Sequence, residues 1–197
     1  AIASVAGAEP TGKVVEDPYE GAVVVDPAKA SPASRDYSPY AGRKYPTRPL
    51  FGDTHHHTSN SGDAFMAGNR LTPEEAYRFA RGEEVVSSTG VPAKLSRPLD
   101  FLVISDHAEG LGLMFQVYEG NPAFMQDPIL TGWNKAMKEG GKAAADAAND
   151  VVSRQAQGTL PAPVKDPKVV GPIMKSVWQQ YTATAEKYND PGRFTAM

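Results

Sequence analysis

The sequence contains no cysteine, few histidines and no long apolar run. Because none of its 197 residues is a cysteine, the chain has no disulfide, no thiolate metal site and no cysteine nucleophile. No stretch approaches the roughly 18 consecutive apolar residues of a membrane-spanning helix, so we expect no membrane span. Lysine and arginine (20) do not outnumber aspartate and glutamate (23), and the resulting net charge of −3 argues against a nucleic-acid partner.

Glycine and proline are plentiful, with 18 and 17 residues. Residues 1–44 combine small, polar and proline residues without an amphipathic period, and we predict an extended leader there. The sequence starts without methionine, and Ala6-Gly7-Ala8 fits the small-residue rule of a signal-peptide cleavage site. Either a targeting segment has been removed or the sequence begins inside a longer chain. The first alternative predicts a periplasmic or secreted protein.

Residues 45–197 carry the alternating strand and helix signals of an α/β domain. Arg48–Asp53 and Leu99–Ser105 predict strands, the second apolar enough to be buried on both faces of a parallel sheet. Thr72, followed by Pro73 and Glu75, predicts a capped helix over 73–81. Further elements are expected as follows: a polar loop at 59–69, a hairpin at 85–95, helices at 111–118, 132–138, 142–157 and 173–188, a proline-rich connector at 160–172 and a strand from 194.

The four histidines of the chain follow two predicted strands; they are His55, His56 and His57 after the first and His107 after the second. The carboxyl ends of parallel strands are where α/β sheets and barrels place ligands and catalytic groups. Residues i and i+2 of an extended segment face the same way, so His55 and His57 can converge on one ion. With Asp63 and Asp106 nearby, the donors suit a divalent ion such as Zn, Mn or Fe.

A simpler interpretation stays open, because three consecutive histidines can be a chance polar loop and an Asp-His pair is common. Their joint placement at two strand ends favours metal binding. We interpret His56 as a packing or supporting residue, since it alternates with His55 and His57. Asp53 is interpreted as the acceptor of a hydrogen bond from a ligand imidazole.

These residues resemble a family of metal hydrolases. The run from Gly52 to Thr58, followed by Ser61-Gly62-Asp63, is similar to the first motif (D-x-H-x-H-T…S-D-G) of the polymerase and histidinol phosphatase (PHP) superfamily. The strand ending in Ser105-Asp106-His107 resembles the second PHP motif, a strand that ends in T-D-H. From about Asp36 onward the chain resembles a poorly characterised, often exported bacterial group of PHP-like proteins, and the shared phrases include Tyr37–Tyr40, Ala76–Glu83, Arg97–Val103 and Tyr188–Ala196.

The resemblance implies a distorted (β/α)7 barrel with two or three metal ions near one face, of which residues 45–197 are an incomplete, N-terminal part. In the family pattern His55 and His57 bind one ion, while Asp63 and His107 approach another. Asp63 lies one place later than in the commonest spacing. The family's bridging glutamate comes from the third strand, so the remaining strands are expected from further chain after Met197 or from a partner polypeptide. A helical insertion is expected over about 108–190, as a surface elaboration or as a lid.

The implied function is metal-dependent hydrolysis of a small phosphoester or related anionic ester by a metal-activated water. Asp106 is the candidate catalytic residue, which accepts a proton or orients a ligand. Arg70 is the candidate for binding the anionic group, with a solvated loop arginine as the alternative. Sulfate esters and amides stay open as substrates. Two other classes stay open as well: a non-catalytic metal-binding or structural portion of a larger exported protein, and an exported partner-binding module.

Overall fold

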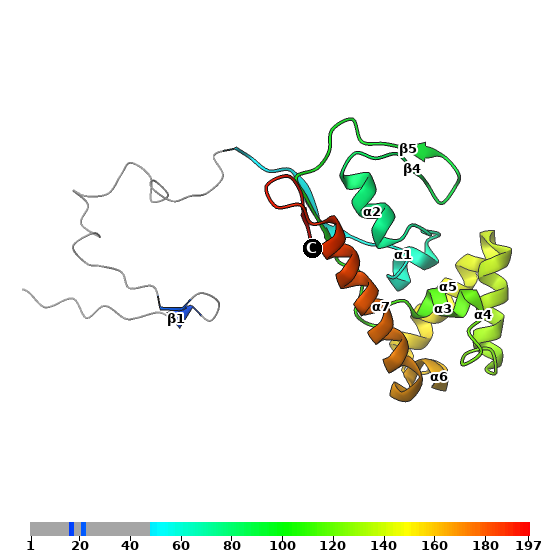
Figure 1. Cartoon of the computed structure of the whole chain (residues 1–197). Helices are drawn as coiled ribbons and strands as arrows, with labels where there is room; N and C mark the ends of the chain where they lie inside the picture. The colour runs from blue at the N-terminus through cyan, green and yellow to red at the C-terminus, as the bar shows by residue number, and fades with distance from the viewer. Residues whose placement is uncertain (1–15, 18–20, 23–47) are drawn as a thin grey trace, which may run out of the picture. The chain divides into compact units, whose positions relative to one another are not determined.

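The computed structural model describes Glu16–Asp17, Gly21–Ala22 and residues 48–197 (Figure 1). The chain divides into two compact units, Ala1–Pro49 and Leu50–Met197. In the first unit β1 (Glu16–Asp17) pairs antiparallel with β2 (Gly21–Ala22). The rest of the leader predicted at 1–44 lies outside the described residues.

The second unit contains a small parallel sheet with the strand order β3-β6-β7. Its strands are β3 (Gly52–His56), β6 (Phe101–Ile104) and β7 (Thr195–Ala196). β6 is central and pairs in parallel with both neighbours. The prediction of a mixed α/β fold with parallel strands is therefore confirmed. Within residues 48–197 these strands form an open sheet, and no closed barrel is present.

α2 (Pro73–Ala80) packs against β6, α7 (Pro167–Tyr188) packs against β7, and the two helices pack against each other. α2 starts with the capping box that the sequence predicts: the Thr72 side chain accepts from the backbone N–H of Glu75, and the Glu75 carboxylate accepts from the backbone N–H of Thr72. This cap satisfies two donors at the start of the helix and fixes where α2 enters the fold.

Burial alternates along β6. Leu102 and Ile104 are buried in a core that α2 and α7 complete, whereas Phe101 and Val103 on the other face are only partly buried. The prediction that this strand is covered on both faces is thus wrong for the described residues. A continuous apolar run does not by itself distinguish a strand that is covered on both faces from one that is covered on one.

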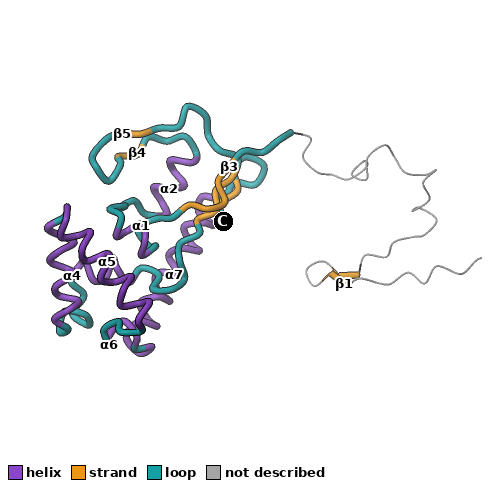
Figure 2. The backbone as a smooth tube through the Cα atoms, turned by 180° about the vertical axis from the view of Figure 1, so that it is seen from behind, coloured by secondary structure: helices purple, strands orange, loops and turns teal. Residues whose placement is uncertain are grey.

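A second core lies among the remaining helices, which are α1 (Gly62–Met66), α3 (Leu113–Glu119), α4 (Pro128–Glu139), α5 (Gly141–Gln157) and α6 (Ala162–Lys165). Phe65, Val117, Phe124 and Leu130 are fully buried there. Figure 2 shows these helices, in purple, gathered beside the strands. The predicted helical character of residues 108–190 is confirmed.

Two stretches that the sequence analysis predicts as irregular are partly helical. The loop expected at 59–69 contains α1. The connector expected at 160–172 contains α6 and the first turns of α7, which therefore begins earlier than predicted. Pro167 takes the first helical position, and Asp166 caps the helix by accepting from the backbone N–H of Lys168. Pro172 lies early in α7 and the helix continues through it.

A short hairpin completes the second unit. β4 (Val85–Val86) and β5 (Pro92–Ala93) pair antiparallel, as predicted within 85–95. No helix in the described part of the chain has the length and apolar character needed to span a bilayer.

Gly52 lies directly against Phe101, its partner in β6. A Cβ atom at Gly52 would overlap the carbonyl oxygen and the ring of Phe101. We expect Gly52→Ala to lower the free energy of unfolding by about 1–3 kcal/mol, because the paired strands have to move apart. Chemical denaturation measures this loss.

Gly132→Ala is the matched control, since a Cβ atom at this helical position meets nothing within 4 Å. We expect it to be neutral or to stabilise α4 by up to about 1 kcal/mol. An equal effect of the two substitutions would contradict the close strand approach at Gly52.

Candidate metal centre

The candidate centre begins at the carboxyl end of β3. This strand includes His55 and His56, so it runs further than the strand predicted to end at Asp53. Its register with β6 shifts, because Asp53 pairs with Leu102 and His56 pairs with Ile104. β3 therefore holds one residue more than β6 over this interval. Such a bulge bends the strand and changes the direction of its side chains.

Three imidazoles lie side by side at this end of the sheet. The ring centroids of His55 and His57 are 4.9 Å apart, and those of His57 and His107 are 5.0 Å apart. The structure thus brings together the three histidines that their spacing and strand-end positions predict to converge. His57 is the most enclosed of them, whereas His55 and His107 are exposed.

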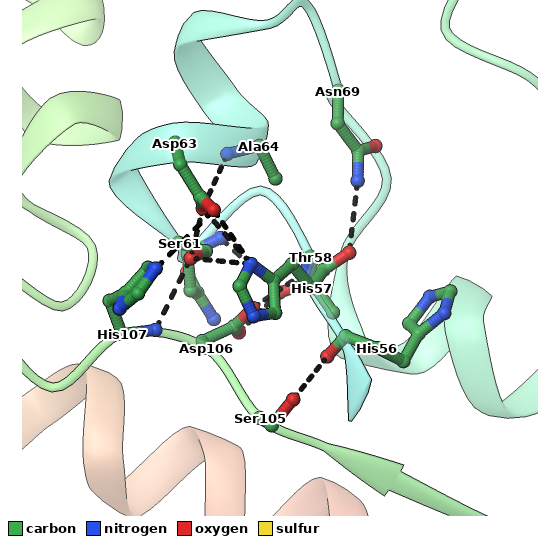
Figure 3. Close-up of polar contacts among 11 residues, drawn as sticks. His56, His57, Thr58, Ser61, Asp63, Ala64, Asn69, Ser105, Asp106 and His107 are labelled. Atoms are coloured by element: carbon green, nitrogen blue, oxygen red, sulfur yellow. Dashed lines mark hydrogen bonds and ion pairs between the residues drawn. The ribbon is translucent and has the colours of Figure 1, made fainter. Parts of the chain in front are cut away.

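Asp63, in the first turn of α1, faces two of these rings (Figure 3). Its carboxylate lies 2.9 Å from Nδ1 of His57 and 3.3 Å from Nε2 of His107. The Ser61 hydroxyl and the Ala64 backbone N–H donate to it at 2.5 and 2.6 Å. Burial acts to raise the pKa of Asp63, but these hydrogen bonds and the one from His57 outweigh it and lower the pKa from 3.8 to about 2. The carboxylate is therefore ionised at neutral pH.

The donor atoms of His57, Asp63 and His107 all lie within 4.8 Å of one another. The separations of 2.9 and 3.3 Å approach the roughly 3.3 Å between two ligands of a tetrahedral ion with bonds of about 2.0 Å. Two imidazole nitrogens and one ionised carboxylate are a donor set that zinc, manganese or iron accepts. These three residues therefore fit a divalent cation, and His55 stands beside them without contributing an atom to the group.

Asp106 joins the ends of the two strands. Its carboxylate accepts from the backbone N–H of Thr58 at 2.5 Å and from the Thr58 hydroxyl at 2.6 Å. Burial raises the pKa of Asp106, and the two hydrogen bonds from Thr58 oppose that rise. Both carboxylate oxygens thus have partners within the protein, and the catalytic role of Asp106 stays a prediction.

Ser61 connects the two histidine segments. Its side chain is fully buried, donates to Asp63 and accepts from the backbone N–H of His107 at 3.2 Å. No role is predicted for Ser61 or Thr58 from the sequence. Their positions inside the first histidine motif could have indicated a role, because small hydroxyl residues beside ligand positions often orient the ligands.

His56 points away from Asp63 and His107 (Figure 3). Its Nδ1 lies 3.8 Å from a carboxylate oxygen of Asp53, and Asp53 also accepts from the backbone N–H of His55. The prediction that His56 stays outside the ligand group agrees with this placement. The prediction that Asp53 accepts from the imidazole of a metal ligand is not confirmed, because the imidazole next to Asp53 is that of His56.

Arg70 is held by the helical core. Its Nη1 donates to the carbonyl oxygens of Phe65 and Asn69, at 2.5 and 3.0 Å. Its guanidinium carbon lies 3.9 Å from the centroid of the Phe65 ring and 5.0 Å from that of Tyr118. These contacts fasten the loop after α1 to the helices. The substrate-binding role of Arg70 stays a prediction.

Residues 44–197 match a protein family described as "Protein of unknown function (DUF3604)". No curated protein and no solved structure matches the chain. The matched stretch contains His57, Asp63 and His107, so the whole candidate centre lies within the family region.

Proposed function

The chain belongs to the DUF3604 family, and we propose that it is a metal-dependent hydrolase that cleaves a phosphoester or a related anionic ester. The observation that supports this most is the close group of donor atoms from His57 and His107, which follow two adjacent parallel strands, and from Asp63 in α1. The resemblance of the surrounding motifs to PHP hydrolases supports the same class of reaction.

In this proposal His57, Asp63 and His107 hold the cation, and His55 is a further ligand beside them. When bound, a zinc, manganese or iron ion would lower the pKa of a coordinated water and would neutralise charge on the ester. Asp63 contributes a full negative charge, because its pKa is about 2. Ser61 keeps that carboxylate directed at both imidazoles, since it donates to Asp63 while it holds the backbone of His107.

The PHP resemblance extends the proposal to the architecture and the location. We infer that β3, β6 and β7 correspond to strands of a distorted (β/α)7 barrel that binds two or three metal ions. Their parallel pairing is compatible with such a barrel. A periplasmic or secreted location stays part of the proposal.

We expect His57→Ala to lose bound metal and to lose phosphoesterase turnover by at least about a hundredfold, because the central imidazole of the group is removed. His56→Ala is the matched control: its ring is the neighbouring imidazole and points away from the donor group. Metal content after dialysis against zinc or manganese, together with a hydrolysis screen on phosphomonoesters and phosphodiesters, measures both effects.

Equal metal content in His57→Ala and His56→Ala would contradict the assignment of the site. Metal bound by the unaltered protein without turnover of any phosphoester, sulfate ester or amide would favour the non-catalytic alternative. Circular dichroism of both variants separates loss of metal from loss of fold.

A further inference from the structure

A cavity of about 390 Å³ opens beside the candidate metal centre. Asp63 and His107, two of the three grouped donors, form part of its wall. The rest of the wall comes from α1, α3, α5 and α6 and the turns beside them. A molecule in this cavity therefore lies directly against the metal centre, and its volume falls in the range of small-molecule sites.

The walls away from the centre are apolar. The side chains that form them are Met66, Met114, Val151, Val152, Leu160 and Val164. All but Val152 belong to the second core or pack against it, so the wall is held in place by the same contacts that stabilise the helices. Binding a hydrocarbon group against such a wall is favourable, because apolar surface is removed from water. Binding a charged group there is unfavourable, because the group loses hydration and finds no partner.

The polar groups of the cavity do not favour an anion away from the centre. Glu109 and Gln155 lie in the wall, and no lysine or arginine does so among residues 48–197. The ionised Asp63 and the carboxylate of Glu109 repel a second negative group in the substrate. Only the cation proposed for the centre supplies positive charge here, so the anionic part of a substrate belongs at the centre and its uncharged part in the cavity.

We propose that this cavity binds the apolar alkyl or aryl group of the substrate's alcohol, so that the substrate is a phosphomonoester of an uncharged, apolar alcohol. The inference rests on the proposed hydrolase function. In the reaction the P–O bond to the alcohol breaks, water supplies the new oxygen of inorganic phosphate, and a proton from water ends on the released alcohol. The cavity thus sets the choice of leaving group.

This assignment gives the helical segment a role in specificity. α5 supplies Val151, Val152 and Gln155 to the cavity, and α6 supplies Val164. The segment is therefore neither a remote surface elaboration nor only a cover. It forms the wall that faces the donors of the metal centre.

A second apolar cavity, of about 610 Å³, provides an internal comparison. Ile104, Met174, Trp178 and Met197 line it, and none of the three grouped donors does. The methionines of the chain therefore distinguish the two cavities: Met66 and Met114 line the cavity at the metal centre, and Met174 and Met197 line the other.

The test is a titration of the full chain with 1-hexanol, followed by NMR of protein labelled with 13C in the methionine methyl groups, with and without zinc. We expect the Met66 and Met114 signals to shift saturably at roughly millimolar alcohol, as a ligand of this size allows. No shift, or shifts confined to Met174 and Met197, overturns the inference whether or not the protein hydrolyses esters.

Two variants sharpen the test. Val152→Asp places a charge in the wall at a side chain that is 66 % exposed, and Val91→Asp makes the same change at one that is 59 % exposed and outside the cavity. We expect hexanol binding to weaken at least tenfold in Val152→Asp only. With zinc bound, KM for hexyl phosphate rises at least tenfold in that variant while KM for methyl phosphate is unchanged.

The two proposals fail in different ways. Hexanol binding at Met66 and Met114 without any turnover by the zinc-loaded protein overturns the hydrolase function and leaves the apolar binding site. Turnover with the same KM ratio of hexyl to methyl phosphate in Val152→Asp and Val91→Asp overturns the cavity assignment and leaves the hydrolase.

Discussion

Replacing Asp63 with asparagine is expected to weaken the binding of zinc or manganese by at least about a hundredfold while the protein stays folded. Asp63 faces both His57 and His107 and is the one carboxylate of the donor group found among the described residues. Asparagine keeps the size of the side chain and an oxygen that accepts from Ser61 and Ala64. It lacks the negative charge that a divalent cation requires. Isothermal titration calorimetry measures the affinity.

Asp146→Asn is the matched control for Asp63→Asn, since Asp146 is an exposed carboxylate on α5 that pairs with Lys142. We expect it to bind metal as tightly as the unaltered protein. Equal affinities for all three proteins would show that the donor group is not the metal site.

In the absence of metal, the effect of Asp63→Asn on the free energy of unfolding is also expected to depend on pH. The pKa of Asp63 is lowered to about 2 in the folded chain from 3.8, so its ionised form stabilises the fold above pH 3.8 and this contribution is lost as the pH falls towards 2. The difference in free energy of unfolding between the unaltered protein and Asp63→Asn should therefore shrink over that interval. Denaturant unfolding at pH 5 and pH 2.5 measures it, and a constant difference would contradict the lowered pKa.

The centre was predictable in outline because it depends on strand ends. An apolar run that stops at a polar residue marks the end of a buried strand, and parallel strands bring their ends to one edge. This reasoning places His57 near His107 although 50 residues of sequence separate them. It requires only that the two strands are neighbours, and β3 and β6 are.

The details of the centre were not predictable from spacing. The bulge in β3 depends on its pairing with β6, which no feature of the sequence from Asp53 to His56 determines. The buried position of Ser61 depends on the short helix α1, in which only Phe65 is buried. A helix of this length has too few turns to produce an amphipathic period.

In the helical region the type of secondary structure was predictable, whereas the bounds of the helices were not. Its helical character is evident from composition, but the boundaries are set by packing. α7 begins at Pro167 because Asp166 caps it, and its early turns pack against the second core through Val169, Val170 and Ile173. Proline is common both in loops and in the first turn of helices, so a proline-rich sequence alone does not choose between them.

Replacing Asp106 with alanine is expected to lower the free energy of unfolding by about 1–3 kcal/mol, because it leaves the Thr58 backbone N–H and hydroxyl without their acceptor. Thr58 is only 1 % exposed, so water does not readily replace the lost oxygens. Metal affinity should fall as well, since the segment from Thr58 to Asp63 is no longer fastened to the end of β6. Denaturant unfolding and metal titration measure the two effects.

Asp106→Asn separates the hydrogen bonds from the charge. The amide oxygen accepts from the Thr58 N–H and the amide nitrogen donates to the Thr58 hydroxyl, so both contacts are retained. Because burial raises the pKa of Asp106, its contribution to stability is complete below pH 3.8 and declines as the pH rises through the folded pKa, whereas asparagine does not titrate. Asp106→Asn should thus gain stability relative to the unaltered protein between pH 3.5 and pH 7. If it does so and also loses turnover with metal still bound, Asp106 acts in the reaction through its charge; unchanged turnover would restrict it to joining the two strand ends.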